Sequence, residues 1–268
     1  MRGLLLLSSL ILLLLNFINK DIIEVDKYNF IEKYNPALSN LNSVDKLISY
    51  TDSTAKASNI SQNSIEYWIL LKNIVSNRFY HGFSHYKLNE NWIAVLSDKI
   101  LGHGLANKVI PDDIMKNPMA GCSQQVAIIM DVASKKNILY RSIGFPHHYA
   151  VELNYNNNWY FFDPDMEPNL SITDRLHQNW NGNNDNLKKY YYGEHKSVDF
   201  ELGKNEKAIL GVPNAKQAPR LKIFQAITLF LSRLLWIVPL ILYFALGKRN
   251  KKSSANTKLT AIPHLLPA

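Results

Sequence analysis

Cysteine is almost absent from this chain. The 268 residues contain one, Cys122, within the run Gly121-Cys122-Ser123-Gln124-Gln125. A single thiol cannot form an intramolecular disulfide, so the chain is not a disulfide-stabilised scaffold. One cysteine also falls short of the cysteine sets that hold structural zinc. Two roles are left for Cys122: a small buried core residue or a nucleophile.

Acidic residues are missing from both ends of the chain. Residues 1–20 carry two basic side chains and residues 220–268 carry eight, with no acid in either segment. Removing these ten charges from the net charge of +8 leaves −2 for the middle of the chain. A nucleic-acid-binding domain carries its basic excess on the folded domain itself. The charge distribution therefore predicts no nucleic-acid partner.

Long apolar runs lie near the two ends of the chain. Residues 3–18 form one such run with a basic residue on each side, the pattern of a signal sequence, but no small residues mark a cleavage site after it. We expect residues 1–20 to be an uncleaved signal anchor, with a cleaved signal peptide as the alternative. Residues 223–247 contain one charge, Arg233, and are long enough to cross a bilayer as a transmembrane helix with a kink at Pro239.

Basic residues give the expected orientation in the membrane. A basic cluster at 248–252 directly follows the second apolar run. Because cytoplasmic flanks of membrane helices are enriched in Lys and Arg, we expect the basic tail 248–268 in the cytoplasm, together with the N-terminus. The middle of the chain is then periplasmic or otherwise extracytoplasmic. It is expected to hold one domain over 21–202 and a tether over 203–222.

The spacing of apolar residues changes within the middle domain. Helical spacing predicts helices over 43–53, 64–79, 91–100 and 122–136. Alternating apolar residues then predict strands over 149–153 and 158–162, separated by an Asn-rich turn. Helices followed by strands indicate an α+β domain, in which a helix packs on an antiparallel sheet.

The predicted hairpin brings a histidine beside an aspartate. A two-residue loop at 155–156, or a four-residue loop at 154–157, pairs His148 with Asp163 across the two strands. Their Cβ atoms would lie about 5 Å apart, which suits a hydrogen bond between imidazole and carboxylate. The neighbouring His147 would point to the other face of the sheet.

These residue types suit nucleophilic catalysis. Cys122 opens a predicted helix, and both a helix N-terminus and an adjacent imidazole favour the thiolate. In such a triad Cys122 is the nucleophile, His148 is the general base and acid, and Asp163 orients the ring. The alternative is structural: a core thiol and a packed His–Asp pair.

The same motifs resemble the transglutaminase-like superfamily of cysteine hydrolases and acyltransferases. The resemblance rests on Gly121-Cys122, His148–Leu153 and Trp159–Pro164, in that order, within a core of about 61–165. It implies a papain-like core in which Cys122, His148 and Asp163 attack an amide or acyl carbonyl through a thioester. The sequence has no acidic cluster similar to the calcium sites of animal cross-linking enzymes, and we expect no cofactor and no metal.

The function expected from the sequence is that of a membrane-anchored cysteine protease, amide hydrolase or acyltransferase. Its substrate would be an exported protein, a peptide or an envelope polymer. The competing expectation is a non-catalytic membrane-anchored module for binding or assembly that keeps the fold. For the oxyanion hole we expect the Cys122 N–H as one donor, with the regions of Trp92 and Gln124 as candidates for a second.

Overall fold

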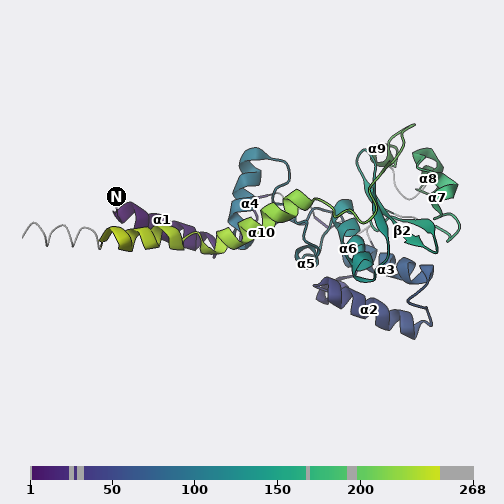
Figure 1. Cartoon of the computed structure of the whole chain (residues 1–268), viewed down its shortest axis with the longest axis horizontal. Helices are drawn as coiled ribbons and strands as arrows, with labels where there is room; N and C mark the ends of the chain where they lie inside the picture. Colours follow the sequence, from purple (N-terminus) through teal and green to yellow (C-terminus); the bar gives the residue numbers. More distant parts are fainter. Residues whose placement is uncertain (1, 24–26, 29–32, 167–169, 192–197, 248–268) are drawn as a thin grey trace, which may run out of the picture. The chain divides into compact units, whose positions relative to one another are not determined.

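The computed structural model describes residues 2–23, 27–28, 33–166, 170–191 and 198–247 (Figure 1). The basic tail expected at 248–268 lies outside these residues. The chain divides into two compact units. Unit 1 comprises residues 1–23, 86–106 and 223–268, and unit 2 comprises residues 24–85 and 107–222.

Unit 2 contains an antiparallel sheet of four strands in the order β3-β2-β1-β4. The strands are β1 (Tyr140–Gly144), β2 (Tyr149–Tyr155), β3 (Asn158–Phe162) and β4 (Ile209–Leu210). The first half of the unit is helical, with 3-10 helix η1 (Pro36–Asn40) and helices α2 (Val44–Ala57), α3 (Ile65–Arg78), α5 (Pro111–Ile114) and α6 (Cys122–Lys135). The expected α+β class is confirmed.

The sheet of unit 2 separates two hydrophobic clusters. On one face Val151, Leu153 and Phe162 join the apolar sides of α2, α3 and α6. On the other face Ala150 and Phe161 join the short helices α7 (His177–Trp180), α8 (Asn184–Tyr191) and α9 (Val198–Leu202) (Figure 1). Because successive residues of a strand point to opposite faces, the two clusters take alternate residues of β2. Helix α6 is therefore held against the sheet that carries the histidine.

The register of the β2–β3 hairpin differs from the prediction by two residues. Tyr155 pairs with Asn158, so the turn is Asn156-Asn157 and not 155–156 or 154–157. Both turn asparagines have positive φ, 50° and 61°, as a type I′ hairpin turn requires. A shift by two residues keeps every side chain on its expected face, because the side-chain period of a strand is two.

The segment expected to be a tether over 203–222 contributes to the sheet. Ile209 and Leu210 form β4 and pair with Gly144 and Ile143 of β1. The pairing continues beyond the strand, since the Gly211 N–H donates to Ser142 O and the Asn214 N–H donates to Tyr140 O. This part of the chain is thus integrated into unit 2.

Unit 1 is helical. It contains α1 (Arg2–Leu15), α4 (Leu88–Leu101), most of α10 (Pro219–Leu234) and a further helix over Ile237–Gly247. Three polar side chains of this unit bond to one another: Asn91 Nδ2 donates to Thr228 Oγ1 at 2.9 Å, and Ser232 Oγ donates to Asn91 Oδ1 at 3.0 Å. Large apolar side chains lie exposed on the outside of the same helices.

The second apolar run is a broken helix. Helix α10 ends at Leu234, and the helix over Ile237–Gly247 is bent from it by 45°. The expected kink at Pro239 explains the break, because proline cannot donate a hydrogen bond to the carbonyl of Leu235 four residues earlier. Among the described residues, this bent pair has the length and composition for a membrane span, and no unbroken helix does.

Candidate active site

Cys122 is the first residue of α6, where the helix meets the sheet. It follows the N-cap residue Gly121 and is buried, with 6% of its surface exposed. A Cβ on Gly121 would lie 3.0 Å from the ring of Phe83, so glycine lets this ring cover the start of the helix. The first N–H groups of a helix have no intrahelical acceptor, and their partial positive charge favours an anion at the position of the sulfur.

His148 and Asp163 lie at the ends of adjacent strands. His148 directly precedes β2 and Asp163 directly follows β3, and His148 Nε2 lies 2.7 Å from Asp163 Oδ2. Both side chains are almost fully buried. The expected contact between these two residues is therefore present, although the register makes them diagonal neighbours and not directly paired ones.

The surroundings of Asp163 hold its carboxylate in a fixed orientation. Oδ1 accepts hydrogen bonds from the N–H groups of Asp165 and Met166, each at 3.0 Å. Oδ2 accepts a further bond from the Tyr191 hydroxyl at 2.9 Å. Burial raises the pKa of Asp163, but the charge and hydrogen bond of His148, with the Met166 and Tyr191 bonds, lower it below its ordinary value.

The pKa of His148 is raised well above its ordinary value. Burial by itself lowers this pKa, and the charge and hydrogen bond of Asp163, followed by those of Cys122, outweigh it. Because Nε2 is bound to Asp163, Nδ1 is the ring nitrogen that meets the thiol. The arrangement favours an imidazolium beside Cys122.

Asp165 is a site residue that the sequence reasoning missed. A carboxylate oxygen of Asp165, the Cys122 sulfur and a ring nitrogen of His148 all lie within 4.8 Å of one another. Its side chain is 5% exposed and accepts a bond from Gln125 Nε2 at 2.9 Å, with His81 Nδ1 3.0 Å away. The Asn156-Asn157 turn was the available signal, because extending that register by a few residues places Asp165 opposite His148.

Neither side chain considered for the oxyanion hole is available as a donor. Gln124 Nε2 donates to Ser84 O and Lys108 O, while its Oε1 accepts the N–H groups of Ser84 and Gly121. The indole N–H of Trp92, in unit 1, donates to Ser232 O. The backbone N–H of Cys122 is the donor that the helix start supplies.

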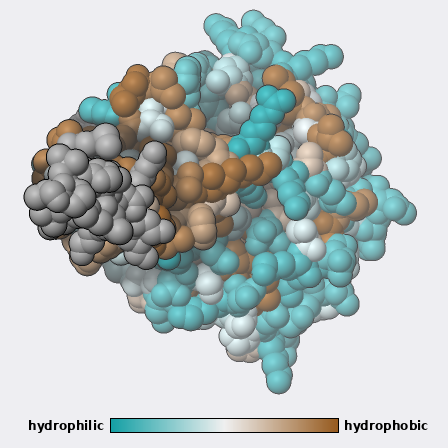
Figure 2. Space-filling view, turned by 60° about the vertical axis from the view of Figure 1, so that its left-hand side comes forward, coloured by the Kyte–Doolittle hydropathy of each residue, from teal (hydrophilic) through white to brown (hydrophobic). Residues whose placement is uncertain are grey.

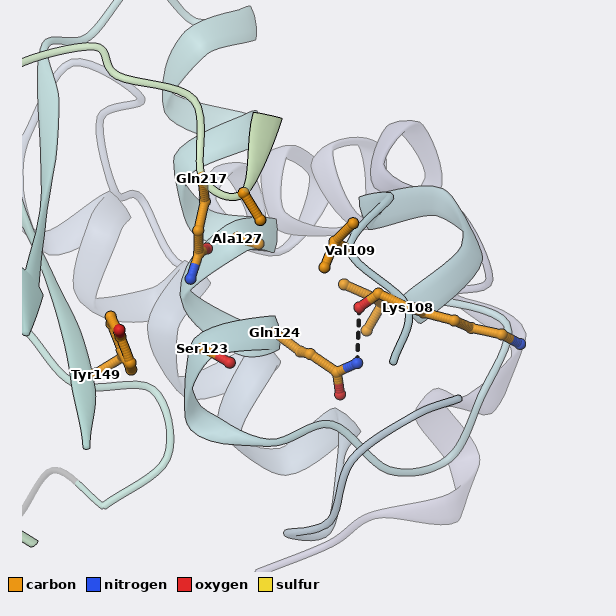
Figure 3. A pocket seen from close by; sticks show the side chains of 9 residues that line it. Lys108, Val109, Ser123, Gln124, Ala127, Tyr149 and Gln217 are labelled. Carbon is orange, nitrogen blue, oxygen red and sulfur yellow. Dashed lines mark hydrogen bonds between the residues drawn. The ribbon is translucent and has the colours of Figure 1, made fainter. Parts of the chain in front are cut away.

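A cavity of about 370 Å³ opens beside α6 (Figure 3). Ser123 and Tyr149, which line it, follow Cys122 and His148 directly in the chain. The labelled Val109, Ala127 and Gln217 project towards the same space from three segments. Most of the lining is apolar or uncharged, and the one charged residue, Lys108, directs its side chain away from the cavity.

The comparisons with known proteins return no relatives. No protein-family model matches the chain, and no curated protein or solved structure is significantly similar to it. The class defined here is thus an α+β protein with a Cys-His-Asp group of triad type at the junction of a helix and an antiparallel sheet.

Proposed function

We propose that this protein is a membrane-anchored cysteine hydrolase or acyltransferase of the transglutaminase-like type, acting on amide bonds. One observation carries the proposal: residues 122, 148 and 163, far apart in the sequence, meet as a thiol, an imidazole and a buried carboxylate. Their order and their elements agree with the family resemblance, with the cysteine at a helix start and the other two residues at strand ends.

The reaction follows from the positions of the atoms. His148 Nδ1 takes the thiol proton, and Cys122 Sγ attacks the amide carbonyl carbon. The Cys122 N–H stabilises the negative charge that develops on the carbonyl oxygen. The imidazolium then returns its proton to the departing amine, and the acyl group stays on sulfur as a thioester. Water or a second amine, deprotonated by His148, attacks the thioester and restores the thiol.

Asp163 acts through His148. Its bond to Nε2 fixes the ring so that Nδ1 faces the sulfur, and its charge stabilises the imidazolium. The buried Tyr191 hydroxyl and two backbone N–H groups keep the carboxylate from rotating away. These contacts give the pair the second layer of support that a preorganised catalytic group needs.

The cavity beside α6 supports a substrate with an uncharged group next to the scissile bond. Val109, Ile114, Ala127 and Tyr149 supply apolar surface, and no charged side chain points into the space (Figure 3). Burying a charge there would cost free energy without a partner. An exported protein, a peptide or an envelope polymer with an apolar group near the amide satisfies this condition.

The construction of unit 1 supports the membrane part of the proposal. Asn91, Thr228 and Ser232 bond to one another inside the unit, while α1, α4, α10 and the last helix carry exposed apolar side chains. Figure 2 shows brown, hydrophobic areas on one face of the molecule. A lipid environment requires this distribution, because polar groups find no water there. Arg2 lies over the ring of Tyr243, so the two chain ends of the unit lie at the same end, in agreement with a cytoplasmic location for both.

Alkylation of the thiol tests the proposal. The full chain, purified in detergent, is treated with iodoacetamide near neutral pH, and the modification of Cys122 is followed by mass spectrometry. We expect His148→Ala to slow the reaction at least about tenfold, because the thiolate loses its cationic partner. His147→Ala is the matched control, since His147 stacks on Phe200 and is not part of the pair.

The outcome distinguishes the proposal from its competitor, a non-catalytic membrane module with the same fold. An inert thiol, or equal alkylation rates in the wild type and His148→Ala, supports the non-catalytic module and contradicts the catalytic proposal. A fast reaction that only the His148 change slows supports catalysis.

A further inference from the structure

The site contains one more metal-binding atom than a thiol protease requires. Cys122 offers a sulfur, His148 a ring nitrogen and Asp165 a carboxylate oxygen, all within 4.8 Å of one another. The catalytic scheme uses the first two and leaves Asp165 without a role. Cys122 and His148 are buried, and the Asp165 side chain is 5% exposed, so the three atoms are shielded from bulk solvent.

The dimensions of this group suit a tetrahedral zinc ion. Zinc binds sulfur at about 2.3 Å and imidazole nitrogen or carboxylate oxygen at about 2.0–2.2 Å, so its ligand atoms stand roughly 3.3–3.7 Å apart. The three atoms lie at most 4.8 Å apart, so shifts of about 1 Å would bring them into that range. Three protein ligands leave a fourth position for water.

The second layer of contacts is of the kind found around bound metals. Metal-bound histidines almost always donate their other ring N–H to a carboxylate or carbonyl, and Asp163 accepts from His148 Nε2. Asp165 is held in turn by Gln125 Nε2 at 2.9 Å and lies beside His81 Nδ1. Each candidate ligand is therefore already oriented by its own neighbours.

We propose that Cys122, His148 and Asp165 bind one Zn²⁺ ion, and that this ion reversibly blocks the nucleophile. The inference rests on the proposed function for its consequence, because an ion bound to the sulfur occupies the position of the substrate carbonyl. Binding requires the thiolate and a neutral imidazole, so the one proton that the Cys122–His148 pair shares leaves to solvent as the ion enters. The metal-free protein is the active form.

The test uses the full chain in detergent, treated with a chelator and then titrated with ZnCl₂ against a chromogenic zinc indicator. We expect one Zn²⁺ per chain and at least tenfold slower alkylation of Cys122 by iodoacetamide once the site is filled. Mg²⁺ and Ca²⁺ should give no protection, because these ions prefer oxygen ligands. Asp165→Asn should weaken Zn²⁺ affinity at least about tenfold.

The matched control is Asp174→Asn, because Asp174 bonds to Ser171 and Tyr190 and is not one of the three ligands. Cobalt provides a readout on the unaltered chain: bound Co²⁺ should show sulfur-to-metal charge-transfer absorption that Cys122→Ser abolishes. The inference is overturned if Zn²⁺ gives no protection to a thiol that reacts in the metal-free protein, if Asp165→Asn binds Zn²⁺ as tightly as the wild type, or if the cobalt band is missing.

These outcomes are separate from those of the proposed function. A metal-free thiol that reacts fast but ignores Zn²⁺ retains the catalytic proposal and removes the metal site. A chain that binds Zn²⁺ through the three residues but has an inert metal-free thiol retains the metal site and removes the catalytic proposal.

Discussion

At the scale of single residues, the His148–Asp163 pair is the most constrained part of the site. Asp163 is fully buried and accepts four hydrogen bonds, from His148, Tyr191 and two backbone N–H groups. A buried carboxylate is tolerated when its charge is paired and its lone pairs are satisfied in this way. Removing the charge therefore affects both the orientation of the imidazole and the stability of the fold.

The pKa shifts of this pair predict how stability depends on pH. The pKa of His148 is raised above 6.5 in the folded protein. The stability that its charged form contributes is therefore complete below pH 6.5 and is lost as the pH rises through the pKa of the folded state. The Asp163 pKa is lowered below 3.8, so its contribution is present above that value and is lost as the pH falls through the folded pKa. The ion pair therefore stabilises the fold most between these two limits.

Asp163→Asn should be destabilised by about 3 kcal/mol near neutral pH, because it leaves His148 without its buried partner. The difference in the free energy of unfolding between this variant and the wild type should become smaller at both high and low pH. Thermal unfolding of both proteins in the presence of a chelator measures it, with Asp174→Asn as the control. A deficit that is the same at every pH would contradict the assigned pKa directions.

At the scale of elements, the hairpin shows what the sequence could predict. The strands and their faces follow from the alternation of apolar residues, so His148 and Asp163 meet even though the register is wrong by two residues. The turn depends on the local preference of Asn156 and Asn157 for positive φ, which apolar spacing does not reveal. Asp165 was missed for this reason.

The spacing of residues in the sequence predicted neither strand β4 nor the wall of the cavity. Ile209 and Leu210 form too short a run for a strand pattern, and their pairing with β1 links residues more than sixty positions apart. The cavity is assembled from segments around Val109, Ser123, Tyr149 and Gln217. Such sites depend on non-local packing, which spacing along the chain does not encode.

A larger side chain in the cavity wall should change which reagents reach Cys122. Val109 lines the cavity, so Val109→Phe should reduce the space beside the thiol. We expect alkylation by a benzyl-substituted iodoacetamide to fall about tenfold relative to plain iodoacetamide, the effect of a few methylenes in an apolar pocket. Val212→Phe is the control, because Val212 is 72% exposed and does not line the cavity. If the ratio of the two alkylation rates is the same in the wild type, Val109→Phe and Val212→Phe, the cavity does not receive substrate.

At the scale of the whole molecule, the set of chain segments that forms unit 1 differs from what the sequence predicted. The sequence predicted the two terminal apolar segments, but it assigned residues 86–106 to the middle domain. The structure groups them with the terminal segments, and Asn91 of α4 bonds to Thr228 and Ser232 of α10. Helix α4 has an ordinary mixed pattern of polar and apolar residues, so its membership in this unit follows from partners distant in the sequence.

The membrane proposal predicts the environment of α4. Ile100 is 80% exposed, so in the proposed setting it faces lipid or the lipid interface. In a Cys122→Ser background, Ile100→Cys should react slowly with a membrane-impermeant thiol reagent until detergent is added. Ser53→Cys, at an exposed position of α2 in unit 2, is the control and should react at once on the side that this unit faces. Rapid reaction of both cysteines in intact membranes would contradict the burial of α4 in lipid.

The chain segments that lead into and out of residues 86–106 are held together at their base. His85 and Asn107 form an antiparallel bridge, and the Lys108 N–H donates to Ser84 O. Gln124 Nε2 donates to Ser84 O and to Lys108 O, the second of which Figure 3 shows. The chain thus leaves unit 2 and returns to it at one place. Residues 86–106 therefore form a long loop that is closed at its base, while α6, the sheet and both sides of this closure belong to unit 2.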